Sequence, residues 1–310
     1  MKHPISSFSE LTTHLQEKNH LYQLSVVCGS DESTISAVMK LVANGYAKAY
    51  FVGQCEQIKK HPKVANYSKD RVTFIEAATA EEAAQKAVTM VRCGEADVLV
   101  KGLIHTDTLL RAVLNKEWGI LPKGNILTHI AMCEIPTYHK LLFFSDAAVI
   151  PYPTHEQRIQ QVGYMADMLH AFGIECPKIA LIHCAETASP KFPHTMGYAE
   201  ICHMANNGRW GRLLVDGPLD LRTACDAIAL KVKGIHSPLQ GEADALIMPD
   251  IESANTLYKA LPLFAKARVA GTLQGTSAPV VLPSRGDDAE AKYHSIALAM
   301  MGCKSVSQQN

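Results

Sequence analysis

The sequence predicts an α/β fold in which mainly parallel sheets are covered by helices. Short β-branched stretches alternate with segments of helical apolar spacing along most of the chain. The predicted strand ADVLVKG at 96–102 is apolar on both faces, which is typical of a parallel strand buried between helices. Neither G-x-G-x-x-G after a strand nor G-x-x-x-x-G-K-[ST] occurs, which argues against a standard dinucleotide fold and a P-loop ATPase.

The first part of the chain alternates regularly. A strand at 24–28 leads into a helix at about 31–43, whose apolar face carries Ile35, Val38, Met39 and Val42, and Gly45 ends it. Further strands are predicted at 49–53, 72–77 and 96–102, with an alanine-rich helix at 81–92.

The pattern changes after Asn115. Segments 126–136 and 140–153 resemble paired strands punctuated by prolines. The later elements are predicted as a helix at 155–172, a strand at 178–185, a helix ending near 206, and strands at 212–217, 243–250 and 278–284. Domain boundaries are expected in the proline-marked region near 128–136 and near 272. We therefore expect one α/β domain from 1–130 plus 272–310 and a second from 131–271.

Charge and composition exclude several functions. The 310 residues carry 30 Lys+Arg and 30 Asp+Glu, so no broad basic surface for nucleic acid or an anionic membrane is expected. Hydrophobic residues at 47% favour a compact globular chain over disorder. The balanced total still leaves room for a few cations to gather at one site.

Cysteine and histidine usage points to a reducing compartment without a metal site. The nine scattered cysteines predict free, mostly buried thiols. The N-terminus lacks the apolar core of a signal peptide, and no segment reaches the ~18–20 apolar residues of a membrane span, so we expect a cytoplasmic protein. The 14 histidines have no metal-ligand spacing, and no metal is expected.

Ligands of open parallel sheets bind at the carboxyl ends of the strands. The strand at 96–100 ends at Lys101, and Thr106 or Asp107 is expected to cap the next helix, with Arg111 about one turn inside it. A helix N-terminus and a guanidinium suit a phosphate. The alternative interpretation is an ordinary cap with a surface arginine.

The strand at 278–284 ends in Ser284 and Arg285, which place a hydroxyl and a guanidinium where an oxyanion or a phosphoryl group would lie. Asp287, Asp288 and Glu290 are predicted in the first turn of the following helix, where they would also oppose the helix dipole.

A third loop carries Asp250 after a buried strand, with Asn255 near the start of the next helix, so both are candidates to face a ligand. The loop at Asp216 carries only a weak turn signal. The residues by themselves thus predict an α/β protein with anion-binding loops, without a reaction.

At these loops the sequence resembles the phosphate acyltransferases, the family of phosphate acetyltransferase and phosphate butyryltransferase, and most of all the butyryl branch. The segments that carry the resemblance are 98–119, 190–195, 213–221, 241–261 and 282–299. The resemblance implies two α/β domains like those of the isocitrate and isopropylmalate dehydrogenases, with the active site in the cleft between them. It implies the reaction butyryl-CoA + phosphate ⇌ butyryl phosphate + CoA, with coenzyme A as substrate, no permanently bound cofactor and a homodimer.

The resemblance also suggests roles for the loop residues. Ser284 and Arg285 correspond to the family's active-site pair, and Arg111 to an arginine of the first loop. Arg285 and Arg111 would bind phosphate, and Ser284 would hydrogen-bond the reacting carbonyl or the thiol. Thr106, Lys101, Asp250 and Asn255 are further candidates for substrate binding. Direct transfer in a ternary complex needs no acyl-enzyme.

One position departs from the acetyl branch, whose proposed catalytic aspartate corresponds to Ala291 here. Asp287 is the candidate base, with Asp288, Glu290, His105 and His294 as alternatives, or no dedicated base at all. Three other interpretations stay open: an acetyl or broad short-chain preference, a metal- and nicotinamide-dependent dehydrogenase of the same fold, and a CoA- or acyl-phosphate-binding protein without activity.

Overall fold

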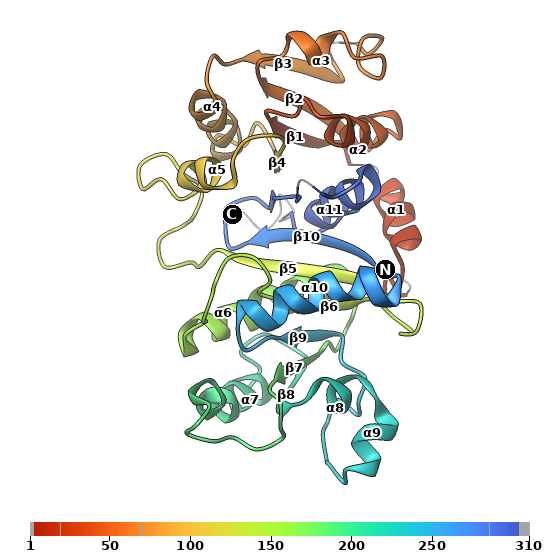
Figure 1. Ribbon diagram of the computed structural model, residues 1–310, viewed down its shortest axis with the longest axis vertical. Helices are drawn as coiled ribbons and strands as arrows, with labels where there is room; N and C mark the ends of the chain where they lie inside the picture. The colour runs from red at the N-terminus through yellow and green to blue at the C-terminus, as the bar shows by residue number, and fades with distance from the viewer. Residues whose placement is uncertain (1–2, 19, 69, 285, 304–310) are drawn as a thin grey trace. The chain divides into compact units, whose positions relative to one another are not determined.

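The computed structural model describes residues 3–18, 20–68, 70–284 and 286–303. The chain folds into two compact units (Figure 1). Unit 1 contains residues 3–7 and Thr128–Val269, and unit 2 contains Phe8–Leu127 and residues 270–303. The N-terminal segment belongs to unit 1, where Ile5 N donates a hydrogen bond of 2.9 Å to Phe172 O.

Unit 2 is built on a mainly parallel sheet with strand order β3-β2-β1-β4-β11-β10. Its pairs are parallel except that β10 runs antiparallel to β11. The strands are β1 (Tyr22–Val27), β2 (Ala47–Gly53), β3 (Val72–Glu76), β4 (Val98–Lys101), β10 (Arg268–Gln274) and β11 (Val280–Val281).

Helices cover both faces of this sheet, α4 and α5 on one and α2 and α11 on the other (Figure 1). The helices of unit 2 are α1 (Phe8–Glu17), α2 (Glu32–Ala43), α3 (Glu56–Lys59), α4 (Ala80–Arg92), α5 (Thr106–Val113) and α11 (Ala289–Met301). Helix α11 is the most deeply buried, because ten of its 13 residues are inaccessible.

Unit 1 has the strand order β5-β6-β9-β7-β8, with β5 and β6 antiparallel and the other pairs parallel. The strands are β5 (Thr128–Glu134), β6 (Leu142–Ser145), β7 (Lys178–Ile182), β8 (Leu214–Leu219) and β9 (Ala245–Ile247). Successive residues of β6 pack on opposite faces: Phe143 meets Phe172 and Phe144 meets Tyr258.

The helices of unit 1 are α6 (His155–Ala171), α7 (Tyr198–Asn206), α8 (Leu221–Cys225), α9 (Ala227–Val232) and α10 (Ile251–Ala265), with a 3₁₀ turn, η1, at Pro193–Gly197. Short polar side chains start several of the helices that follow strands. Thr154 and Gln157 form a capping box on α6, and Asp250 caps α10. In unit 2, Asp31 and Thr79 cap α2 and α4.

The α/β class and the mainly parallel sheets predicted from the sequence are confirmed, as is the pairing of the two strands after Asn115, which the structure shows to be antiparallel. The elements α1, α3 and β10 were not predicted. The expectation that most cysteines are buried was wrong, because only Cys55 and Cys133 are buried, although all nine are free. No helix in the described part of the chain is long and apolar enough to cross a membrane.

Candidate active site

The loops that follow β1 and β4 meet at the carboxyl edge of the unit 2 sheet. Gly102 N donates to Val27 O and Leu103 N donates to Cys28 O, each at 2.8 Å. A Cβ on Gly102 would lie 2.3 Å from Cys28 O, a distance that carbon and oxygen do not tolerate. Glycine is therefore required for the two loops to approach this closely.

The loop after β11 leaves the same edge beside β4. Val281 pairs with Val100 in parallel register, so Lys101 and Leu282 emerge side by side. Lys101 is only 4% exposed, and its Nζ donates to Gly102 O at 3.3 Å. The register therefore brings the loop that carries Ser284 next to the loop that carries Lys101.

Thr106 and Arg111 are exposed on α5. The expectation that Thr106 or Asp107 caps this helix was wrong, because Thr106 is already its first residue and His105 occupies the N-cap position without a side-chain capping hydrogen bond. The first N–H groups of α5 thus receive no side-chain acceptor from the cap. Arg111 lies in the last turn and makes no ion pair with a described residue, so its guanidinium is available to an anion.

A short hydrogen-bonded loop presents Ser284 and Asp287. Ser284 N donates to Asp287 Oδ2 at 2.8 Å, Asp287 N donates to Ser284 O at 3.2 Å, and Gly286 N donates to Ser284 Oγ at 3.4 Å. Burial raises the pKa of the Asp287 carboxyl above its usual value, and the Ser284 N–H and Lys292 oppose that rise in part. Arg285, the other predicted catalytic residue, lies outside the described residues.

The prediction that Asp287, Asp288 and Glu290 share the first turn of a helix needs correction. Asp288 is the N-cap of α11 and accepts from Ala291 N at 2.8 Å, whereas Asp287 precedes the helix. The helix dipole and the cap therefore account for Asp288. Asp287 is left as the carboxylate of the loop itself.

The two histidines considered as alternative bases lie in different environments. His294 is 6% exposed and stacks on Phe8, with ring centroids 4.2 Å apart, so it is part of the core. His105 is exposed at the start of α5.

Asp250 and Asn255 belong to unit 1, whereas the other predicted site residues belong to unit 2. Asp250 Oδ1 accepts from Ser253 N at 2.8 Å, which caps α10, and Asn255 Nδ2 donates to Ala147 O at 2.9 Å. Both side chains thus order the loops that follow β9 and β6. Their role in substrate binding stays a prediction.

The sequence analysis missed Asp146, which is buried at the end of β6. Its carboxylate accepts hydrogen bonds from Thr128 Oγ1 at 2.8 Å and from four backbone N–H groups. These donors are His129 N at 3.1 Å, Ala148 N at 2.9 Å, Val149 N at 2.9 Å and Ile150 N at 3.2 Å. Asp146 therefore fixes the loop after β6, and only the adjacent Ser-Asp at a strand end could have signalled it.

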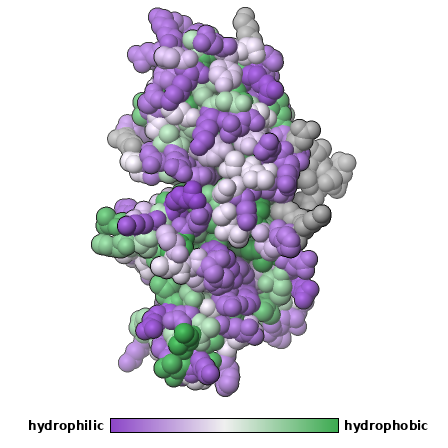
Figure 2. All heavy atoms as spheres, turned by 90° about the vertical axis from the view of Figure 1, so that its right-hand side faces the viewer, coloured by the Kyte–Doolittle hydropathy of each residue, from purple (hydrophilic) through white to green (hydrophobic). Residues whose placement is uncertain are grey.

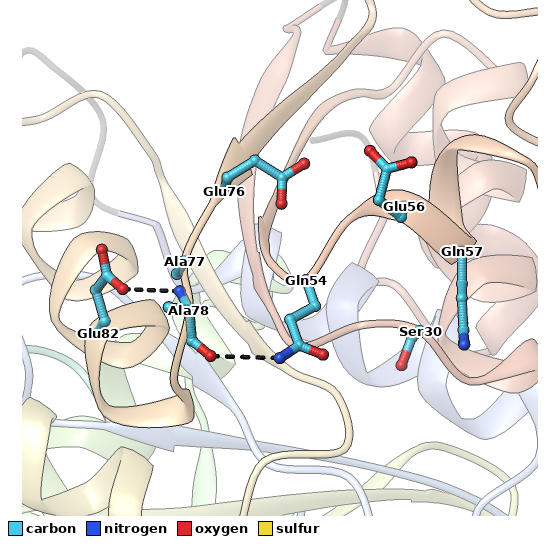
Figure 3. A pocket seen from close by; sticks show the side chains of 8 residues that line it. All are labelled: Ser30, Gln54, Glu56, Gln57, Glu76, Ala77, Ala78 and Glu82. Carbon is cyan, nitrogen blue, oxygen red and sulfur yellow. Dashed lines mark hydrogen bonds between the residues drawn. The ribbon is translucent and has the colours of Figure 1, made fainter.

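A pocket of about 600 Å³ lies farther along the edge of unit 2, at the ends of β1, β2 and β3 (Figure 3). Its carboxylates already have partners: Glu76 pairs with Lys59 at 2.6 Å, and Glu82 accepts from Ala78 N at 2.7 Å. Gln54 Nε2 donates to Ala78 O at 3.3 Å. This acidic lining is poorly matched to an anionic ligand. Among the described residues, no group of three or more His, Cys, Asp or Glu could hold a metal ion.

Fold and loops together define an α/β protein whose neighbouring loops at the carboxyl edge of unit 2 carry Lys101, Ser284 and Asp287. Comparison with known proteins makes the assignment specific, because residues 67–300 match the family model described as phosphate acetyl/butaryl transferase. The chain belongs to this phosphate acetyl/butyryl transferase family.

Two curated relatives align over nearly the whole chain. The phosphate butyryltransferase of Clostridium acetobutylicum is 37% identical over 297 residues, covering 96% of this chain and 98% of that protein. The phosphate acetyltransferase of Thermotoga maritima is 36% identical over 279 residues, covering 89% of this chain and 94% of that protein.

Solved structures agree with the family. A branched-chain phosphotransacylase from Enterococcus faecalis V583 superposes with a TM-score of 0.80 at 32% identity, covering 91% of this chain and 99% of that one. A structure described as a putative 4-hydroxythreonine-4-phosphate dehydrogenase from Salmonella typhimurium has a TM-score of 0.54 at 12% identity, covering 92% of this chain and 100% of that one. The second likeness concerns the fold alone, and it confirms the predicted relation to a dehydrogenase-like fold.

Proposed function

We propose that the protein is a phosphate acyltransferase that converts butyryl-CoA and inorganic phosphate into butyryl phosphate and coenzyme A. The observation that carries this proposal is the loop with Ser284 and Asp287, which leaves β11 next to the loop that joins β4 to α5. The near full-length similarity to a phosphate butyryltransferase supports the same activity. Coenzyme A is then a substrate, and no cofactor is bound permanently.

In the direction of acyl phosphate, an oxygen of inorganic phosphate attacks the thioester carbonyl, a C–O bond forms and the C–S bond breaks. Arg285 and Arg111 bind the phosphate, and Lys101 adds positive charge at the strand end. Ser284 donates a hydrogen bond to the carbonyl oxygen as it becomes negative. Asp287 accepts the proton of the attacking phosphate and passes it to the departing thiolate.

The carboxyl group of Asp287 fits this role because it is partly buried and its pKa lies above the usual value. A stronger base can accept the proton and still return it within one turnover. With both substrates bound together, the acyl group passes directly between them, and no acyl-enzyme forms. We propose that the units act as the two domains of this enzyme, with Asp250 and Asn255 as binding residues of unit 1.

An acetyl preference is the second candidate, favoured by the phosphate acetyltransferase that is 36% identical. One methylene in an apolar pocket changes the binding free energy by only ~1–3 kcal/mol, so acetyl, propionyl and butyryl groups can all react. The dehydrogenase alternative is less well supported, because the relatives that are more than 30% identical are acyltransferases.

We further propose a cytoplasmic homodimer. Two helices of unit 1 carry exposed apolar side chains: Ile228 and Val232 on α9 are 75% and 81% exposed, and Leu263 and Phe264 on α10 are 72% and 82% exposed. Figure 2 shows hydrophobic surface on this unit. Apolar surface of this kind is typical of interfaces between protein copies.

The test is a thiol-release assay with phosphate and acetyl-, propionyl- or butyryl-CoA. We expect phosphate-dependent thiol release with the highest kcat/KM for butyryl-CoA, and loss of most of this activity in Arg285→Ala. Equal values for the three thioesters would support the broad specificity instead. If coenzyme A binds to the purified protein and no thiol is released from any of the three, the protein is a binding protein and the proposal is wrong.

A further inference from the structure

Helix α11 carries one cation into the core of unit 2. Every residue from Lys292 to Met301 is buried, and Lys292 itself is only 6% exposed. A buried ammonium costs several kcal/mol of desolvation unless it is paired and hydrogen-bonded. Lys292 Nζ donates to Asp31 Oδ1 at 2.8 Å and to Thr34 Oγ1 at 2.9 Å, so both partners come from the start of α2.

The pair joins two loops of the candidate active site. Asp31 caps α2 directly after the loop that follows β1, and its Oδ1 also accepts from Thr34 N at 3.0 Å. Lys292 N donates to Asp288 O at 3.2 Å, one turn into α11, so Lys292 is anchored to the last residue of the loop 284–288. The ammonium group therefore fixes the start of α11, and with it Asp287, against the start of α2.

The charge of Lys292 also acts on Asp287. The groups that act on the Asp287 carboxyl are the Ser284 N–H and Asp288 from its own loop and Lys292 from α11. Lys292 is itself paired with Asp31 at the start of α2. Asp288 raises the pKa of Asp287, and Lys292 lowers it. Among the described residues, Lys292 is the cation in this set.

We infer that Lys292 is a positioning residue for acyl transfer, whose buried ion pair with Asp31 holds Asp287 and the start of α11 in place. This inference rests on the proposed function. Lys292, eight residues after Ser284, is then expected to affect the pH at which kcat/KM falls on the acid side. Lys292 itself touches neither substrate.

The experiment compares the pH dependence of kcat/KM for butyryl-CoA in five proteins: wild type, Lys292→Met, Lys292→Arg, Asp31→Asn and the double variant Asp31→Asn/Lys292→Met. The single variant Lys292→Met leaves the partly buried Asp31 carboxylate without its cation and can fail to fold. The double variant removes both charges, and asparagine keeps the cap on α2, so it preserves the fold. The thermal unfolding midpoint is measured for each protein.

Asp287 must be ionised to accept a proton, so activity falls as the pH drops through its pKa. Without Lys292 this pKa rises, and the acid limb of kcat/KM moves to higher pH in Lys292→Met and in the double variant. The acid limb stays near its wild-type position in Lys292→Arg, which keeps the charge. It does not move to higher pH in Asp31→Asn, which removes a negative charge instead.

The inference is overturned if the double variant folds and its acid limb stays at the wild-type pH. It is also overturned if the acid limb moves to higher pH by the same amount in Asp31→Asn as in Lys292→Met, because a purely structural role of Lys292 predicts the same effect from loss of either charge. The variant Asp287→Asn identifies the limb, since the limb should vanish in that protein. Wild-type protein without phosphate-dependent thiol release would instead overturn the proposed function, so the two failures are distinguishable.

Discussion

Gly102 lies so close to Cys28 that a Cβ would stand 2.3 Å from the Cys28 carbonyl oxygen and 2.5 Å from Gly29 Cα. Both neighbours are backbone atoms, which cannot rotate away as a side chain can. The contact sets the spacing between the loops after β1 and β4, and Lys101 immediately precedes it.

We therefore expect Gly102→Ala to destabilise the protein by about 1–3 kcal/mol, the usual cost of overpacking. It should also lower kcat/KM, because the loop that carries Lys101 must move. Urea unfolding and the thiol-release assay measure the two effects.

Gly163→Ala is the matched control, since its Cβ would meet only the side chain of Trp210, 3.1 Å from Nε1. Alanine favours the helix around position 163, so this variant should lose little or no stability. A Gly102→Ala protein as stable as this control would show that the backbone contact is not restrictive.

A second prediction concerns acid stability. Burial alone would raise the pKa of the Asp31 carboxyl, but hydrogen bonds from Lys292, Thr34 and Ser33 lower it from 3.8 to about 2. Because the folded-state pKa lies below the unfolded value, this carboxylate stabilises the fold at pH above 3.8 and loses that effect as the pH falls toward 2. The contribution at neutral pH is about 2 kcal/mol.

Asp31→Asn should accordingly cost about 3 kcal/mol at pH 7, since it also leaves Lys292 unpaired. The difference from wild type should shrink as the pH is lowered from 5 to 2.5, because below about 3.8 the unfolded chain binds a proton at Asp31 that the folded protein does not yet bind. Chemical denaturation of both proteins across this pH range measures the difference in unfolding free energy. A difference that is constant with pH would contradict the ion pair between Asp31 and Lys292.

A third prediction concerns Asp146 in unit 1. Asp146→Asn replaces an oxygen that only accepts hydrogen bonds with an amide group that faces N–H donors, so buried donors lose their acceptor. We expect a loss of about 3 kcal/mol in the free energy of unfolding, measured by urea denaturation.

The control for this substitution is Asp226→Asn. Asp226 caps α9 by accepting from Ile228 N and Ala229 N, and asparagine caps as well as aspartate does, so the change should stay within about 0.5 kcal/mol. An equal loss of unfolding free energy in the two variants would mean that the five hydrogen bonds to Asp146 contribute no more to stability than an ordinary helix cap does.

The element order of the fold could be predicted because periodicity and caps are local properties. The helical apolar spacing at about 31–43 and a strand apolar on both faces at 96–102 both led to the observed α/β arrangement. The predicted strands were too long near loops: 243–250 was expected where β9 covers Ala245–Ile247. Residues 248–250 lie outside the sheet and lead into α10. Hydropathy alone does not predict where a strand ends and the next loop begins.

The sequence predicted the loop residues of the candidate site but not the ion pair that holds one of these loops in place. Ser284 and Asp287 were proposed because they follow a predicted strand. Lys292 was missed because its partner Asp31 is 261 positions away in the sequence, and no local pattern joins them. Asp287 and Asp288 could not be told apart, since either can cap a helix and only the backbone of the loop decides which one does.

The last prediction concerns the cations that bind phosphate. Arg111→Ala should lower kcat/KM for phosphate by about a hundredfold while changing KM for butyryl-CoA much less, because a guanidinium offers phosphate two parallel hydrogen bonds. Arg111→Lys keeps the charge without this geometry and should recover only part of the loss. Arg222→Ala is the matched control, since Arg222 is exposed in unit 1 and lies 3.7 Å from Asp226. Steady-state kinetics with phosphate as the varied substrate decides the matter, because equal effects of Arg111→Ala on both substrates would place Arg111 outside the phosphate site.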